Sequence, residues 1–144
     1  YSQQLRRLPG PLANLSVFAN ATWIQTEGNY GGASVVRELV NFVPRTWNTG
    51  VSWRGRRFSA NVKYNVRSRF LMSRNANTGE EIRQRENARL DTGGTFRFAK
   101  RWTLYADATN VLAEPEIWDS VVPDRVNRYG KLAPAINLGL RAEF

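Results

Sequence analysis

The chain has 144 residues, which is enough for one ordinary domain and too short for two. It contains no cysteine and no histidine, which excludes disulfides, metal sites built on these residues and catalytic triads with a histidine base. Lys and Arg outnumber Asp and Glu by 21 to 12, so the net charge of +9 belongs either to a solvated surface or to a protein that binds polyanions.

The predicted elements are β-strands, recognised by apolar residues at every second position. A weak strand opens the chain at residues 1–8, and a clear one follows at residues 15–23, where Phe18 is an exception on the polar face. The same period recurs in five further segments, with Tyr105 as a second exception, at residues 46–54, 57–67, 89–98, 102–109 and 136–144. The sequence therefore predicts about seven antiparallel strands in one domain that covers residues 1–144.

The connections between these strands alternate between short and long. Residues 9–14, 54–57 and 99–101 form tight turns, whereas long polar connections are predicted at residues 25–44, 68–87 and 112–128. Membrane barrels have short periplasmic turns at one end and long extracellular loops at the other. No stretch approaches the roughly 20 consecutive apolar residues of a membrane helix. Loop alternation therefore favours an outer-membrane β-barrel.

The two faces of the predicted strands differ in kind. Alternation alone fits a soluble sandwich as well as a barrel. Here, however, the polar face carries long charged groups in mid-strand, and the apolar face combines small residues with aromatic residues near the strand ends. Such a pattern is typical of strands with lipid on one side and a wet lumen on the other, and charges in the lumen would explain most of the net charge. The charged residues concerned are Lys63, Arg89, Asp91, Arg97 and Arg141.

Strand parity carries a further expectation. If the chain ends in the periplasm, seven strands place Tyr1 on the extracellular side, whereas a secreted barrel starts in the periplasm and has an even number of strands. We therefore expect these strands to be the last part of a longer polypeptide. In the closing strand, Pro134 has no backbone N–H to donate to a neighbouring strand, so it predicts a strand start or a bulge at this position.

The final strand resembles the C-terminal signal of outer-membrane barrels, which is recognised by the barrel assembly machinery. This signal combines a polar residue, a glycine, alternating apolar residues and a terminal Phe, here Asn137, Gly139, Leu140, Ala142 and Phe144.

More of the chain is similar to the end of TonB-dependent outer-membrane receptors. The similarity covers essentially all 144 residues in order, and the segments that carry it are residues 8–12, 17–22, 43–45, 58–60, 64–68, 106–112 and 129–131. It implies that the chain is the C-terminal barrel segment of a 22-stranded receptor in the bacterial outer membrane, with an N-terminal plug. Such receptors import a scarce nutrient, for example a siderophore, cobalamin or a saccharide, with energy delivered through TonB.

The partners implied are outer-membrane lipid, the remaining strands and plug of the same receptor, TonB through a more N-terminal part, and a transported small ligand. We expect no enzymatic activity, no cofactor, no bound metal and no nucleic acid. Ligand contacts are expected in the long connections, from aromatic side chains and arginines such as Tyr30, Phe42, Arg74 and Trp118.

Other readings of single motifs are weaker. Asp91-Thr92-Gly93 matches the aspartic-protease tripeptide, but that chemistry needs two such Asp residues, and one copy is present. Carboxylates for glycoside hydrolysis would have to come from long polar connections with no pocket-forming context, and those for loose calcium binding lack the spacing of an EF-hand. The acidic residues concerned are Glu80, Glu81, Glu114, Glu116, Asp119 and Asp124.

Two rival functions stay open. One is a small or multi-chain outer-membrane barrel, and the other is a soluble basic β-domain that binds nucleic acid through arginines interleaved with aromatic residues. Arg54, Arg56 and Arg57 cluster at one tight turn, however, and basic turns that meet anionic head groups at a membrane surface explain them more simply.

Overall fold

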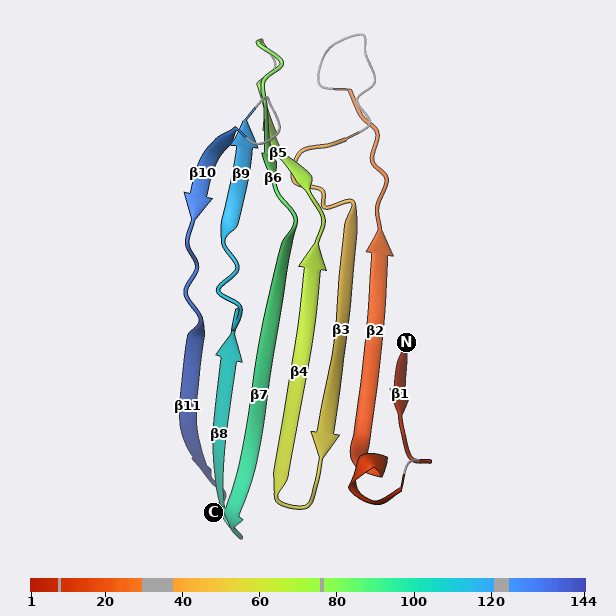
Figure 1. Cartoon of the computed structure of the whole chain (residues 1–144), viewed down its shortest axis with the longest axis vertical. Coiled ribbons are helices and arrows are strands. Elements are labelled where there is room, and N and C mark those ends of the chain that lie inside the picture. Colours follow the sequence, from red (N-terminus) through yellow and green to blue (C-terminus); the bar gives the residue numbers. More distant parts are fainter. Residues whose placement is uncertain (8, 30–37, 76, 121–124) are drawn as a thin grey trace.

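The computed structural model describes residues 1–7, 9–29, 38–75, 77–120 and 125–144, and these form an all-β protein with two antiparallel sheets (Figure 1). One short 3-10 helix, η1 (Gly10–Asn14), precedes the second strand. The strands of the large sheet, in spatial order, are β1 (Ser2–Gln4), β2 (Leu15–Trp23), β3 (Arg45–Arg54), β4 (Phe58–Arg67), β7 (Asn87–Ala99), β8 (Trp102–Thr109) and β11 (Ala135–Ala142).

The large sheet confirms the seven predicted strands and their hairpin order. Each strand pairs antiparallel with the next predicted strand along the chain, from Ser2↔Phe18 in the first pair to Ala142↔Trp102 in the last. The tight turns lie together at the lower end in Figure 1, and the long connections lie together at the upper end. β11 begins at Ala135, immediately after Pro134, which confirms the strand start predicted there.

The long connections are more ordered than the sequence indicates. The segments at 68–87 and 112–128, expected to be polar loops, contain a second sheet in the order β10 (Val126–Gly130), β9 (Glu116–Ser120), β6 (Glu81–Gln84) and β5 (Phe70–Arg74). This order repeats that of β11, β8, β7 and β4, and the four strands stand directly above those four in Figure 1. The second sheet therefore extends two hairpins past the end of the large sheet.

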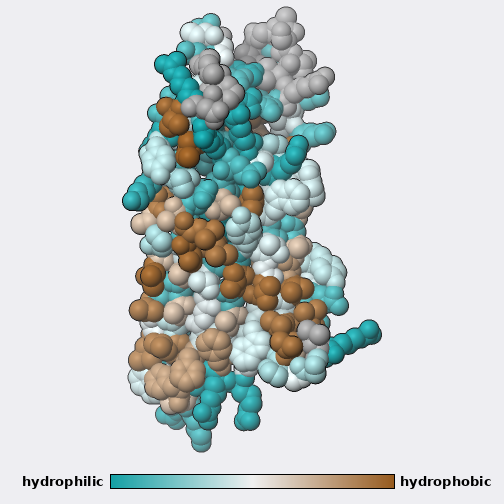
Figure 2. Space-filling view, in the orientation of Figure 1, coloured by the Kyte–Doolittle hydropathy of each residue, from teal (hydrophilic) through white to brown (hydrophobic). Residues whose placement is uncertain are grey.

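Register places the apolar residues of neighbouring strands in continuous rows. One row runs across Val17, Val51, Val62 and Thr92, and the rows on either side hold side chains of the same kind. Val51 and Val62 are exposed, Val17 and Thr92 are half-buried, and Leu138 at the β11 edge reaches 72 %. In Figure 2, hydrophobic groups gather over the long strands and hydrophilic groups lie at both ends.

A conventional core is almost absent from the described part of the chain. Its only buried hydrophobic residues are Phe70 and Leu71, both in β5 and hence in the second sheet. The apolar face of the large sheet is therefore not covered by any described part of this chain.

The large sheet is open. β11 pairs only with β8, and β1 pairs only with β2, so within the described residues the two outer strands do not meet. No helix among the described residues is long and apolar enough to cross a bilayer.

The two exceptions to the alternation, Phe18 and Tyr105, have a common structural cause. Phe18 is paired with Gly50, and a Cβ added at Gly50 would lie only 2.6 Å from Phe18 Cζ. Tyr105 is paired with Gly139, and a Cβ there would overlap the Tyr105 ring. Each aromatic ring thus covers a glycine on the neighbouring strand, an arrangement that restores packing where a strand has no side chain.

Candidate functional site

The polar face of the large sheet is joined by side-chain hydrogen bonds between strands. Asn48 Nδ2 on β3 donates to Asn20 Oδ1 on β2 at 2.7 Å. Ser59 on β4 and Thr95 on β7 share a hydrogen bond of 2.6 Å between their hydroxyl oxygens. Charged groups lie on this same face, where Lys63 is opposite Asp91 in the register. The face is therefore suited to water or to a polar partner.

Asp91 organises the place where β8 leaves the large sheet. Its Oδ1 accepts a hydrogen bond of 3.0 Å from the backbone N–H of Asn110, and its Oδ2 accepts one of 3.2 Å from Asn65 Nδ2. Asn110 has a φ of 52° and is buried, and its Nδ2 donates to the carbonyl oxygens of Glu114 and Leu132. Asp91, the residue of the protease-like tripeptide, thus anchors the turn at Asn110 through one carboxylate oxygen and bonds to β4 through the other.

A polar hollow of about 340 Å³ opens beside this turn. Its lining combines amide, hydroxyl and charged groups from three strands, β3, β4 and β7, namely Thr46, Asn48, Asn65, Val66, Arg67, Asn87, Arg89 and Asp91. Arg89 Nη2 is held 2.9 Å from Glu116 Oε1, and Asn87 Nδ2 donates to the carbonyl oxygen of Pro115 at 3.1 Å. The hollow therefore lies where β7 meets the connection between β8 and β9.

The second sheet is held together by ion pairs. Asp119, on β9 and only 4 % exposed, accepts hydrogen bonds from Arg85 Nε at 2.9 Å and 3.0 Å, and Arg69 Nη2 lies 3.7 Å from it. Because Asp119 is buried, removing its cations would leave an uncompensated charge, which is strongly unfavourable. From the sequence, Asp119 is expected only as a carboxylate in a polar loop, and this structural role is not predicted.

A second network reaches from β5 and β6 to the long β2–β3 connection. Glu81 accepts hydrogen bonds from Arg74 and Arg83, and Arg83 Nη2 lies 2.6 Å from Glu38 Oε2. Burial alone raises the pKa of the Glu81 carboxyl, but the hydrogen bonds from Arg74 and Arg83 outweigh burial and hold its pKa below the ordinary 4.5. Burial likewise lowers the pKa of Arg83, but hydrogen bonds to Glu38 and Glu81 raise it overall.

This network predicts an acid-sensitive β5–β6 hairpin. Because the folded-state pKa of Glu81 is depressed, its contribution is complete above 4.5 and is lost as the pH falls through the lower folded-state pKa. We expect the protection of the β5 and β6 amides against hydrogen exchange, measured relative to unstructured amides at the same pH, to fall over that acid range. The Glu81→Gln variant should exchange fast at neutral pH already, whereas Glu80→Gln, which removes the same charge from a residue without an ion pair among those described, should not. Equal effects of the two variants would contradict this role.

The residues predicted to contact a ligand are only partly brought together. Tyr30 lies outside the described residues. Phe42, 48 % exposed, lines a hollow of about 350 Å³ with Phe70 and Leu71. Arg74 is engaged with Glu81 at the far end of the β5–β6 hairpin.

Trp118 lies in β9, paired in the register with Gln84, which in turn pairs with Phe70. The guanidinium of Arg128 stacks over the Trp118 ring, with Cζ 4.6 Å from the centroid. Trp118 Nε1 is buried and lacks a hydrogen-bond partner among the described residues. Phe42 and Trp118 thus lie on the same end of the molecule, whereas the described contacts do not join Arg74 to either of them. Sequence reasoning missed Phe70, whose short apolar run was hidden in a polar segment.

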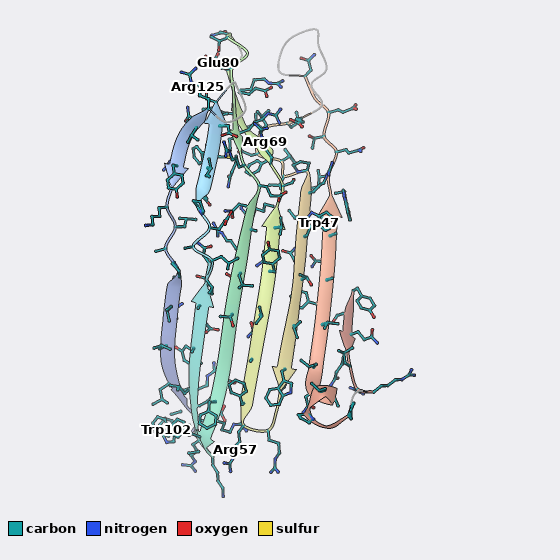
Figure 3. The ribbon with its side chains drawn as sticks, in the orientation of Figure 1. Trp47, Arg57, Arg69, Glu80, Trp102 and Arg125 are labelled. Carbon is teal, nitrogen blue, oxygen red and sulfur yellow. The ribbon has the colours of Figure 1, made fainter. Side chains whose placement is uncertain are left out.

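Aromatic residues border the apolar face at both ends. Trp23 and Trp47, near the long connections, pack edge to face with centroids 5.6 Å apart, and Trp53 and Phe58, near the short turns, lie 5.8 Å apart. Figure 3 shows Trp47 near the upper end of β3 and Trp102 at the lower end of β8. Two aromatic belts of this kind mark membrane–water interfaces in barrels.

Three polar groups of the apolar face donate hydrogen bonds to backbone carbonyl oxygens. Thr49 Oγ1 donates to the Phe18 carbonyl oxygen at 3.1 Å, and Thr92 Oγ1 donates to the Asn61 carbonyl oxygen at 3.0 Å. Trp53 Nε1 donates to the Pro11 carbonyl oxygen at 2.8 Å. These groups therefore present little unpaired polarity to whatever covers the face.

The residues of the predicted assembly signal lie in or just after β11. Asn137 and Gly139 are on the polar face, paired with Asp107 and Tyr105, and Leu140 and Ala142 are on the apolar face. Phe144 follows the strand and is fully exposed.

The interleaved arginine and aromatic residues considered for nucleic acid do not form one surface. Arg54, Arg56 and Arg57 are at the β3–β4 turn, whereas Arg69 is beyond the opposite end of β4 and paired with Asp119. Trp53, Phe58 and Tyr64 instead belong to rows of the apolar face. Among the described residues, no group of three or more acidic side chains is placed to hold a metal ion.

Comparison of the chain with protein-family models gives no match, and comparisons with curated proteins and with solved structures give none either. The functional assignment therefore depends on the geometry described above and on the sequence resemblance.

Proposed function

We propose that this chain forms the closing strands of the 22-stranded outer-membrane barrel of a TonB-dependent receptor, which imports a scarce nutrient. The observation that carries the proposal is the apolar face of the large sheet. From β2 to β11 the described residues of this face are exposed or half-buried, none is fully buried, and none is charged apart from Arg45 at the very start of β3. A soluble protein would rarely leave so large an apolar surface in water.

The dimensions of the sheet support a membrane. Apart from β1, its strands have 8 to 13 residues, and tilted transmembrane strands need about 9–11. On β3, Trp47 and Trp53 are six residues apart, which corresponds to roughly 20 Å along a strand. The apolar band of outer-membrane barrels is about 25 Å tall.

The open edges support a larger assembly. Unpaired backbone groups at a sheet edge are not tolerated in lipid, so β11 and the β1–β2 edge need further strands as neighbours. In the proposed receptor these come from the same polypeptide, and the polar face with its hydrogen-bonded Asn and Thr residues lines the lumen against a plug. The second sheet then stands outside the membrane, with Phe42 and Trp118 available for a ligand.

A different assembly would also supply hydrogen-bonding neighbours for the two edge strands. Several copies of a small chain could close a barrel together, with β11 of one chain beside the first strands of the next. The open sheet makes such a multi-chain barrel the second candidate, because its two edge strands could pair with those of another copy.

The experiment that tests the proposal is the denatured mass of the polypeptide that carries this sequence, measured in detergent-extracted outer membranes. A mass several times 16.4 kDa, with nutrient uptake that stops when TonB is removed, is the expected result. A mass near 16.4 kDa in that fraction would replace the large receptor by the multi-chain barrel. Recovery without detergent would reject the membrane assignment altogether.

A further inference from the structure

The positive charge of the chain is concentrated at one end of the large sheet. Nine of the 21 Lys and Arg residues lie at the short-turn end, where Glu143 is the one acidic residue among those that the structure describes. The remaining twelve are matched by eleven acidic residues, so this end supplies nearly all of the net charge of +9. The nine are Arg6, Arg7, Arg54, Arg56, Arg57, Arg97, Lys100, Arg101 and Arg141.

Two neighbouring turns bring four of these cations together. Pairing of β4 with β7 places the β3–β4 turn beside the β7–β8 turn, and the backbone N–H of Arg97 donates to the Arg57 carbonyl oxygen at 2.6 Å. A hollow of about 380 Å³ lies between the turns, lined by Arg56, Arg57, Arg97, Phe98, Ala99 and Lys100. No carboxylate lines it, and among the described residues none is ion-paired with these cations. The hollow therefore offers concentrated, uncompensated positive charge to an anion.

The surroundings of the hollow are apolar on one side. Phe98 lines the hollow and also belongs to the exposed apolar face, 51 % exposed, together with Phe58 and Trp102. Figure 3 places Arg57 and Trp102 at the same end of the sheet, and Figure 2 shows hydrophilic groups there, directly below the hydrophobic surface. A ligand with an anionic group and an apolar tail fits this border better than a purely polar polyanion does.

We propose that the adjacent β3–β4 and β7–β8 turns bind the phosphate of an anionic phospholipid, whose acyl chains lie against Phe58, Phe98 and Trp102. This inference rests on the proposed membrane placement and adds a lipid preference to it. Cationic side chains at a membrane surface attract anionic lipid, whereas zwitterionic lipid provides no net charge to hold.

The test uses the full polypeptide in phosphatidylcholine bilayers that contain a trace of spin-labelled phosphatidylglycerol or phosphatidylcholine. Electron paramagnetic resonance measures the motionally restricted fraction of each label. We expect phosphatidylglycerol to be bound about tenfold more strongly than phosphatidylcholine, with the preference falling towards unity when Arg56, Arg57, Arg97 and Lys100 are changed to Gln. A matched control changes four exposed cations near the long connections, Arg45, Arg67, Arg125 and Lys131, to Gln, and it should keep the preference.

Several results would overturn the inference. The wild-type protein could restrict both labels equally, or the two variants could lose the preference equally, which would indicate a general charge effect. Inorganic phosphate that displaces the lipid label at concentrations comparable with those of the lipid would indicate a site for a small anion. If the fourfold variant does not assemble, the preference of the wild-type protein for phosphatidylglycerol and its reduction in the single Lys100→Gln variant still test the inference. Failure to enter bilayers at all would instead reject the proposed function.

Discussion

The Val62→Arg substitution is expected to destabilise the protein in lipid by about 2–4 kcal/mol if β4 crosses the bilayer as proposed, because that is the cost of an arginine at the lipid face near the bilayer centre. Val62 is in the middle of β4, 44 % exposed, between Val51 and Thr92 in the register. An arginine there could not reach water at either end without crossing several residues of the apolar face. The measurement is a guanidinium titration of the polypeptide folded into lipid vesicles.

The matched control for this prediction is Asn61→Arg, one residue earlier on the same strand. Asn61 is on the polar face, where it faces Gly93 and lies in a row that includes Asp107. An arginine there remains on the polar face, which lines the lumen in the proposed barrel, and can pair with Asp107, so we expect a loss well below 1 kcal/mol. If the two substitutions cost the same, the apolar face is not in contact with lipid.

The second large effect is expected at Gly139, where any side chain meets the Tyr105 ring. Gly139→Val should cost about 1–3 kcal/mol, because the ring has to leave its position or the strands have to separate. The double variant Gly139→Val, Tyr105→Ala should recover much of that loss, since the clash is removed with the ring. The free energy of unfolding of the two single variants and the double variant gives the coupling directly.

This cycle also separates packing from targeting. Gly139 belongs to the predicted assembly signal, so a purely signal-based defect would not be rescued by a change at Tyr105. Gly130→Val provides a control, because a Cβ at Gly130 meets only ordinary contacts, the nearest being the Glu116 carbonyl oxygen at 3.6 Å. A defect at Gly139 that persists fully in the double variant would refute the steric explanation.

The large sheet was predictable from the sequence because alternation is a local signal that each strand carries by itself. The ladder from Leu15 to Ala142 follows from period two, and the turn lengths then fix which strands are neighbours. The Phe18 and Tyr105 exceptions were visible too, but their cause was not, since it requires the register that sets them opposite Gly50 and Gly139.

The second sheet was missed because its signal is not local. β6 has four residues and β5 and β9 have five each, too few to establish a period. Their pairing depends on Asp119 meeting Arg85 and on Glu81 meeting Arg74, contacts between segments that the sequence shows only as polar. For the same reason, the predicted ligand residues could be assigned to long connections but not to one site.

The continuation of β4, β7, β8 and β11 into a second sheet has a consequence for how the protein responds to its medium. The same hairpins are held by ion pairs in one half and by an apolar band in the other. Dissolved salt weakens attraction between partly exposed charges but leaves apolar association intact or strengthens it. If the sheet lies in the outer membrane as proposed, a rise in salinity outside the cell would therefore loosen the partly exposed ion pairs of the extension, such as Arg74 with Glu81, while the apolar band kept its shape. The part beyond the membrane could then adjust to its medium without loss of the part within it.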